Sequence, residues 1–149
     1  MGFRMRFSDF FRKWRRPIAA HDLAGEVGRN ERIARFIGHR SLLYSDSERA
    51  KPAAYMPRSG MTSVFRVDGL RTEDVRHLGS RALKKPPPIA HATCRGSAIY
   101  DCDLRFDPDN MPERHANIVG WPERKDHQKL LCIRLAACAE VCRYGPQAS

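Results

Sequence analysis

The chain has 149 residues, which is enough for one domain or for one domain with an appended arm. Hydrophobic residues make up 42% and charged residues 30%, and these proportions exclude disorder along the whole chain. The net charge is +10, which favours a polyanionic partner. No apolar run approaches the roughly 18 residues that a bilayer span needs, so we expect no transmembrane segment.

The positive charge is concentrated at the N-terminus and is carried mainly by arginine. Residues 1–17 hold six of the 27 Lys and Arg residues and one of the 17 Asp and Glu residues. The planar guanidinium group of Arg suits contacts with phosphate, so this composition favours a nucleic acid as partner. A GC-rich genome also produces an excess of Arg over Lys, and this alternative stays open.

Residues 1–29 are expected to form a basic amphipathic arm followed by a linker. On a helical wheel, the large apolar side chains of residues 3–18 fall on one stripe, and Pro17 ends or kinks the helix. The basic residues expected to contact nucleic acid here are Arg4, Arg6, Arg12, Lys13, Arg15 and Arg16. Two alternatives use the apolar stripe, namely peripheral contact with a membrane surface and docking on a protein. The docking residues would be Phe7, Phe10, Phe11 and Trp14.

A compact domain is expected over residues 30–142, followed by a tail at 143–149. NERIARFIGH at 30–39 predicts a short helix, and AAYMP at 53–57 and TSVFRV at 62–67 predict two strands. Residues 72–83 have the amphipathic pattern of a helix, for which Thr72 is a suitable N-cap.

In the second half of the domain, predicted strands again alternate with predicted helices. AHATC at 90–94, LRFDPD at 104–109 and HANIVGW at 115–121 predict strands, with a short helical turn in GSAIYDC between the first two. A long helix is expected over residues 123–142. These elements predict an α+β fold with a four- or five-stranded, mostly antiparallel sheet packed by two or three helices.

The five cysteines indicate a reducing compartment. Their number is odd, and three of them lie in the helix expected at 123–142, where a disulfide would need distortion. These residues are Cys132, Cys138 and Cys142. Small core thiols in the cytoplasm explain this pattern best. The basic residues at the N-terminus have no apolar segment after them, so we expect no secretory signal.

Three stretches of the domain carry a resemblance to known sequences: RFIGHRSLLYS, AAYMPRSGMTSVFRVDGL and RHANIVGWPERKDHQKLL. On these motifs, the chain resembles a family of small, uncharacterised bacterial and phage-borne proteins over about residues 31–142. The resemblance implies a real domain and no particular activity. Residues 1–30 lie outside it.

A pair of histidines is the most specific candidate for chemistry. His91 opens HATC and His115 opens HANI, a pattern similar to the paired His-x-Thr/Ser motifs of two-histidine phosphoesterases. If the two strands are neighbours, the imidazoles flank one phosphate as general base and general acid, and Arg66 and Arg114 stabilise the phosphorane. This hypothesis predicts a metal-independent RNase or phosphodiesterase with His91, His115 and Arg66 as catalytic residues. Alternatively, the histidines only form hydrogen bonds at strand ends.

Other catalytic and metal patterns are weaker. His91, Cys94, Cys102 and His115 supply zinc-ligand side chains with only one tight pair, so we expect no metal and no cofactor. The sequence shows neither a Ser-His-Asp order nor a Gly-x-Ser-x-Gly elbow. A solvated acidic rim is expected at Asp101, Asp103, Asp107 and Asp109.

Two stretches of the domain extend the basic surface. FIGHRSLLYS contains Arg40 and Tyr44, and Arg beside aromatic rings suits stacking on single-stranded bases, with Arg66, Tyr55 and Phe65 as further lining. In this domain, the residues expected to contact nucleic acid are Arg40 and Arg124. Arg124 follows the strand-to-helix corner GWP. A positively charged surface without a ligand is the alternative.

These observations favour a small, basic, cytoplasmic protein that binds RNA or DNA mainly through Arg–phosphate contacts, as part of a phage or defence-related complex. The first alternative is an interaction or regulatory subunit that docks on a protein partner. The second is the two-histidine enzyme, and the third is a membrane-surface protein.

Overall fold

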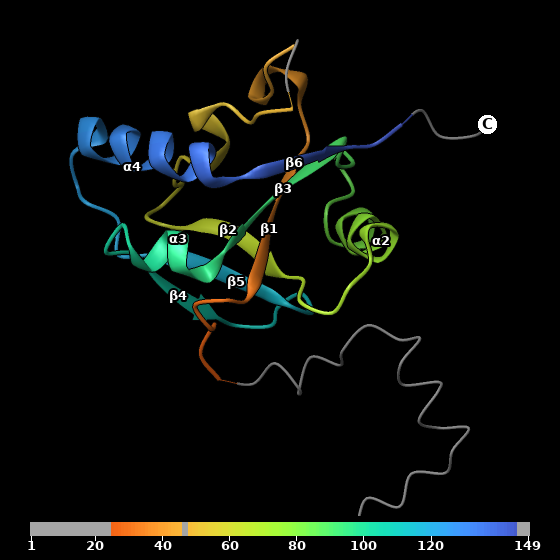
Figure 1. Ribbon diagram of the computed structural model, residues 1–149, viewed down its shortest axis with the longest axis horizontal. Helices are drawn as coiled ribbons and strands as arrows, with labels where there is room; N and C mark the ends of the chain where they lie inside the picture. Colours follow the sequence, from red (N-terminus) through yellow and green to blue (C-terminus); the bar gives the residue numbers. More distant parts are fainter. Residues whose placement is uncertain (1–24, 46–47, 146–149) are drawn as a thin grey trace, which may run out of the picture.

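An open, six-stranded antiparallel sheet organises the computed structural model, which describes residues 25–45 and 48–145 (Figure 1). The strands are β1 (Arg32–Ile37), β2 (Thr62–Arg66), β3 (Ala90–Arg95), β4 (Arg105–Pro108), β5 (His115–Val119) and β6 (Glu140–Arg143). The α-helices are α2 (Thr72–Ala82), α3 (Gly96–Tyr100) and α4 (Lys125–Cys138), and two 3-10 helices are η2 (Arg40–Leu42) and η3 (Pro52–Tyr55). The expected α+β class is confirmed, whereas the sheet has six strands instead of four or five.

The order of the strands is β4-β5-β2-β1-β3-β6, and every neighbouring pair is antiparallel. β1 and β2 therefore occupy the centre of the sheet. The two strands that carry the histidines lie on either side of this central pair, β3 with His91 next to β1 and β5 with His115 next to β2. This order decides which of the sequence motifs meet. The stretches SVFRVDGL and RHANIVGWP lie side by side, because β2 pairs with β5.

The two faces of the sheet are covered by different helices (Figure 1). On one face, Ile33, Val64 and Ile118 of the sheet pack with Leu135 of α4 in the larger apolar cluster. On the other face, which we call the α2 face, the smaller cluster is Ala34, Phe36, Phe65, Val67, Leu70, Val75 and Leu78. Alternate residues of each strand point to opposite faces, so the register assigns each side chain to one of the two.

The helix expected at residues 30–39 is wrong, because β1 occupies residues 32–37. Ile33 and Ile37 face α4, whereas Ala34 and Phe36 face α2, so this central strand is buried on both sides. A strand buried on both faces has a nearly continuous apolar sequence, and its periodicity cannot be told from that of a short helix. Pairing with β2 and β3 decides the structure.

Two further differences explain the strand count. AAYMP contains the 3-10 helix η3, with Pro52 at its first turn, and not a strand. The helix expected at 123–142 ends at Cys138, and residues 140–143 form β6, which supplies the hydrogen-bonding partner that the outer edge of β3 needs. Cys142 is therefore in a strand. The other expected strands and the helix at 72–83 are confirmed to within a few residues, with Arg71 and not Thr72 as its N-cap.

Candidate functional site

His91 and His115 lie on the same face of the sheet but do not converge. His91 pairs with Phe36 of β1, and His115 pairs with Phe65 of β2, so β1 and β2 separate the two histidine strands. Neighbouring strands are about 4.8 Å apart, and three such steps place the two backbones roughly 14 Å apart. The two imidazoles therefore cannot flank one phosphate, which corrects the geometry assumed for a two-histidine phosphodiesterase.

A row of aromatic rings joins the two histidines across the α2 face. Ring centroids are 5.2 Å apart for His115 and Phe65, 5.2 Å for Phe65 and Phe36, and 6.3 Å for Phe36 and His91. The ring of Tyr144 continues the row, with its centroid 5.4 Å from that of His91. Both imidazoles thus make edge contacts with a phenylalanine, and their other neighbours decide their chemistry.

His91 belongs to the packed interior. It is 3% exposed, and its Nδ1 atom lies 2.7 Å from the hydroxyl of Tyr144, over whose ring Arg76 of α2 sits at 4.9 Å. Burial, together with the positive charge of Arg32, lowers the pKa of His91 to about 4. His91 is therefore neutral at pH 7, and its hydrogen bond with Tyr144 connects β3 to the residue that follows β6.

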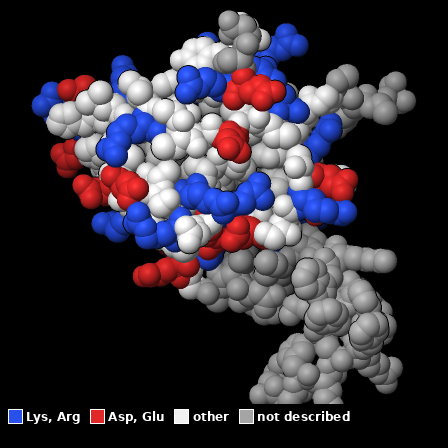
Figure 2. Space-filling view, viewed as in Figure 1, with Lys and Arg blue, Asp and Glu red and all other residues white. Residues whose placement is uncertain are grey.

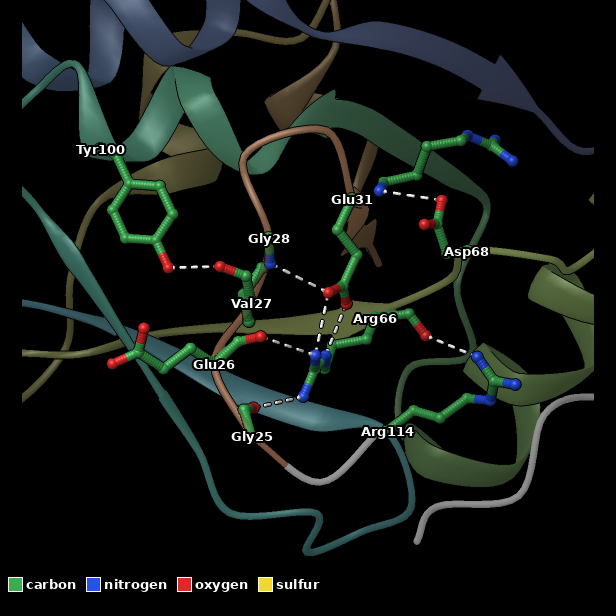
Figure 3. A network of polar contacts seen from close by, with 10 residues as sticks. Gly25, Glu26, Val27, Gly28, Glu31, Arg66, Asp68, Tyr100 and Arg114 are labelled. Atoms are coloured by element: carbon green, nitrogen blue, oxygen red, sulfur yellow. Dashed lines mark hydrogen bonds and ion pairs between the residues drawn. The ribbon is translucent and has the colours of Figure 1, made fainter. Parts of the chain in front are cut away.

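Arg66 is a buried structural side chain (Figure 3). Its Nε atom lies 2.5 Å from Oε2 of Glu31, its side chain is 4% exposed, and it donates to the carbonyl oxygens of Gly25 at 3.0 Å and Glu26 at 3.2 Å. Arg66 pairs with Ile33, so its side chain lies on the face opposite His115. The guanidinium of Arg114 donates a hydrogen bond to the backbone carbonyl oxygen of Arg66. The set of His91, His115 and Arg66 is not assembled, and residues 25–26 are fastened to β2 instead.

His115 has a different set of polar neighbours. Its Nδ1 atom lies 2.6 Å from Oδ1 of Asp109, and its Nε2 atom lies 3.1 Å from Oγ of Ser63. The β4–β5 hairpin brings Asp109 and His115 together, because Asp109 follows β4 directly and His115 begins β5. Ser63 comes from β2, where it is paired with Asn117 and points to the same face as His115.

The protonation of this group follows from the chemistry of its members. Burial raises the pKa of the Asp109 carboxyl, but hydrogen bonds from His115 and from the backbone N–H of Met111 outweigh it, so the pKa lies below the ordinary value. A carboxylate only accepts, which places the proton of a neutral imidazole on Nδ1. Nε2 then presents a lone pair, and the hydroxyl of Ser63 donates to it.

No pattern in the sequence indicated this group. Ser63, Asp109 and His115 meet in space although no catalytic order is recognisable in the sequence, and Asp109 is a hydrogen-bonded partner of His115 as well as part of an acidic rim. The alternation of side chains along a strand was the one available signal. It places Ser63 and Phe65 on one face of their strand and His115 and Asn117 on one face of theirs, and these faces coincide when the two strands pair in this register. Nothing local in the sequence states that β2 and β5 are neighbours.

Comparison with models of protein families, with curated proteins and with solved structures found no match. The resemblance to small bacterial and phage-borne proteins stays a prediction.

The side chains considered for zinc lie apart. Cys94 pairs with Ile33 and belongs with Cys102 to the core on the α4 side, whereas His91 and His115 point to the α2 face. Burial raises the pKa of the Cys94 thiol to about 12 and that of Cys132 to about 11, as expected of packed thiols. Within residues 25–45 and 48–145, no three His, Cys, Asp or Glu side chains are grouped to hold a metal ion.

Many arginines have structural roles. Six of them in the described part of the chain donate to backbone carbonyl oxygens: Arg35, Arg66, Arg95, Arg114, Arg134 and Arg143. Arg124 forms an ion pair with Asp126 at 2.7 Å, whereas Arg40 is exposed on η2. The arm residues Arg4, Arg6, Arg12, Lys13, Arg15 and Arg16, like Phe7, Phe10, Phe11 and Trp14, lie outside the described residues. Part of the Arg excess therefore stabilises the fold.

The loop at residues 39–51 combines exposed cations with an exposed ring. Tyr44 is 43% exposed, and the Nζ atom of Lys51 lies 5.7 Å from its ring centroid. His39 caps η2 by accepting from the N–H of Ser41, and the expected lining residues Tyr55 and Phe65 are buried. The basic and aromatic surface predicted for this stretch is therefore reduced to its outer part.

None of the helices in residues 25–45 and 48–145 has the length and the apolar content that crossing a bilayer requires.

Proposed function

We propose that this protein binds single-stranded nucleic acid, RNA or DNA, with the loop at residues 39–51 as one contact surface. The observation that carries the proposal is the exposed ring of Tyr44 in a cationic setting. Single-stranded nucleic acids bind proteins by stacking bases on aromatic rings while Lys and Arg neutralise the phosphates.

The surroundings of Tyr44 support this role. A cavity of about 170 Å³ lies beside the ring, and its lining includes Arg49 and, from α4, Ile133 and Ala136. Arg143 of β6 donates to the carbonyl oxygen of Tyr44 and so ties the loop to the sheet. An apolar surface next to a ring suits the flat face of a base.

The positive charge near this surface is confined to a few residues of the loop. Arg40 and Arg49 are exposed and Lys51 is half-buried, against one described acid in the loop, Glu48. Figure 2 shows Lys and Arg interspersed with Asp and Glu over the face that it presents, with no uniform basic area. We therefore expect the domain to contribute a few phosphate contacts, to which the six basic residues of the N-terminal arm add.

The test is a titration of fluorescently labelled 12-nucleotide RNA and DNA with the full chain, read by anisotropy at several salt concentrations. Tyr44→Ala should weaken binding about tenfold, because loss of one stacked base costs about 1–3 kcal/mol, whereas Tyr44→Phe should retain most of the affinity. Arg49→Gln should lower the salt dependence, and Arg81→Gln on α2 is the matched control for the loss of one charge.

Equal affinities for wild type, Tyr44→Ala and Arg49→Gln would contradict the loop as the contact surface. Absence of binding at low salt would contradict the function as a whole. That outcome would favour the interaction-subunit alternative, for which Leu130 and Ile133 of α4, 61% and 52% exposed, are the apolar contacts to mutate next.

A further inference from the structure

We infer that Ser63 is an activated nucleophile and that Ser63 and His115, positioned by Asp109, form a catalytic site for the hydrolysis of carboxylic esters. This activity is separate from the proposed binding of nucleic acid, because the residues involved lie on other elements than the loop at 39–51.

The geometry matches the requirements of a serine nucleophile. A general base must lie within hydrogen-bond reach of the hydroxyl, and a third group must orient the base. Nε2 of His115 lies 3.1 Å from Oγ of Ser63, and Nδ1 lies 2.6 Å from Oδ1 of Asp109. The two nitrogen atoms of the ring are thus used in the two roles that nucleophilic catalysis needs, and the ionised carboxylate selects the tautomer that accepts from Ser63.

The supporting groups hold this arrangement in place. Oδ1 of Asp109 also accepts from the backbone N–H of Met111 at 3.1 Å, and Oδ2 accepts from the side-chain amide of Asn117 at 3.3 Å. The imidazole of His115 packs edge-on against Phe65. A carboxylate held from two sides and a ring held by packing keep the base directed at Ser63 before a substrate arrives.

The nucleophile is accessible while the base is sheltered. Ser63 is an exposed residue near the start of β2, whereas His115 and Asn117 are each 8% exposed. A substrate can therefore approach the hydroxyl from solvent, while the imidazole of His115 is largely buried and the side chain of Asp109 is 37% exposed.

Each step of the reaction balances with water as the second substrate. Oγ of Ser63 forms a bond to the carbonyl carbon while its proton moves to Nε2 of His115, and the C–O bond to the leaving alcohol breaks as that alcohol takes the proton from Nε2. Water then attacks the acyl-Ser63 ester and gives a proton to Nε2. The carboxylic acid leaves, the proton returns to Oγ, and no oxidant or reductant is involved.

An ester suits the site better than a phosphodiester. In acyl transfer one imidazole acts first as base and then as acid, so a single histidine is sufficient. Cleavage of RNA by two imidazoles needs a second ring beside the same phosphate, and His91 is three strand positions away with its Nδ1 atom engaged by Tyr144. The structure supplies one imidazole, one hydroxyl and one carboxylate, which is the set for acyl transfer.

The experiment treats the full chain with a fluorophosphonate, which bonds covalently to activated serines, and measures intact mass and the modified peptide. Hydrolysis of p-nitrophenyl acetate is followed in parallel. We expect one adduct, on Ser63, and none in Ser63→Ala. Ser80→Ala removes an exposed serine of α2 and is the matched control, which should react like wild type.

Two positioning variants sharpen the assignment. Asp109→Asn should slow ester hydrolysis by about tenfold or more and change its pH profile with little change in KM, because the favoured tautomer of His115 no longer accepts from Ser63. His115→Gln should abolish the adduct, and circular dichroism must show that both variants are folded. If His115→Gln proves unstable, Ser63→Cys tests the same position with another nucleophile and should retain acylation.

The proposal is overturned if the adduct forms on another residue, if Ser63→Ala hydrolyses the ester at the wild-type rate, or if folded wild-type protein forms no adduct. RNA and DNA titrations of Ser63→Ala should match those of wild type. Failure of the ester reaction with intact nucleic-acid binding, or the reverse, distinguishes this proposal from the proposed function.

Discussion

His91 and His115 occupy two halves of the same sheet face, and the two halves differ in what covers them. In the first half, α2 packs on Phe36 of β1, and His91 lies against Phe36 and Tyr144, over whose ring Arg76 of α2 sits. In the second half, β2 and β5 carry His115 next to the exposed Ser63 and the half-exposed Asp109. The same imidazole ring, with the same edge contact to a phenylalanine, stabilises one half and supplies a base in the other.

Both histidines are buried, so the difference shows that hydrogen-bonding partners, and not residue type, decide the role of a histidine. His91 has a neutral phenol as partner, so nothing compensates the cost of charging it in the interior. His115 has a carboxylate on one nitrogen atom and a hydroxyl on the other, which is the arrangement that the proposed general base requires. Four predictions test this contrast.

Replacing His91 should have the largest effect on stability. His91→Ala removes a buried ring that contacts Phe36 and leaves the hydroxyl of Tyr144 without its partner, so we expect a loss of about 3–4 kcal/mol in the free energy of unfolding. Urea denaturation measures this loss. Ser63→Ala, in the open half, should change the stability by less than about 0.5 kcal/mol. Equal losses in the two variants would contradict the contrast between the halves.

The dependence of stability on pH should separate the two halves next. The pKa of His91 is about 4 in the folded protein and 6.5 when unperturbed, so the unfolded chain binds this proton first. Stability should therefore fall by about 2–3 kcal/mol as the pH decreases from 6.5 towards 4, and His91→Phe should remove this slope. Asp109 has a lowered pKa, so its contribution is present above pH 3.8 and is lost at more acidic pH. Two separate windows in urea titrations at stepwise pH would confirm this assignment, and a flat profile in wild type would refute it.

Gly79 tests how α2 covers the first half. A Cβ atom at this position would lie 2.5 Å from Cε1 of Phe36, the ring that contacts His91. Gly79→Ala should therefore destabilise the protein by about 2 kcal/mol through overpacking, although alanine favours helix over glycine. The reaction of Ser63 with a fluorophosphonate should keep its rate, and thermal unfolding should show the loss. A stabilised Gly79→Ala variant would show that α2 does not press on this ring.

The hydroxyl of Tyr144 should have the smallest effect. Tyr144→Phe keeps the ring contacts with His91 and Arg76 and removes one hydrogen bond, for an expected loss of about 1 kcal/mol. Chemical denaturation of the variant beside wild type measures it. Tyr44→Phe, whose hydroxyl belongs to an exposed ring, is the control and should be neutral. A loss as large as that of His91→Ala would mean that the hydroxyl, and not the packing of the ring, holds this edge.

Much of the local structure could be predicted from the sequence. Alternation and turn residues located β2, β3, β4 and β5, and the apolar spacing of residues 72–83 located α2. β1 was missed because a strand buried on both faces lacks alternation, and β6 was missed because the helical pattern continues past Cys138 without a glycine or a proline. A local pattern cannot assign an element where the helical and the strand periodicity fit the residues equally well.

The candidate site, too, depends partly on local sequence and partly on tertiary structure. The sequence by itself determined that Ser63 and Phe65 share one side of a strand, and that His115 and Asn117 share one side of another, because this follows from the geometry of a single strand. Only the tertiary structure decided that β2 lies next to β5 while β3 lies beyond β1, since strand order depends on long-range pairing that no local residue specifies. That order separates His91 from His115 and joins His115 to Ser63, and so it sets which of the two histidines stands beside a nucleophile.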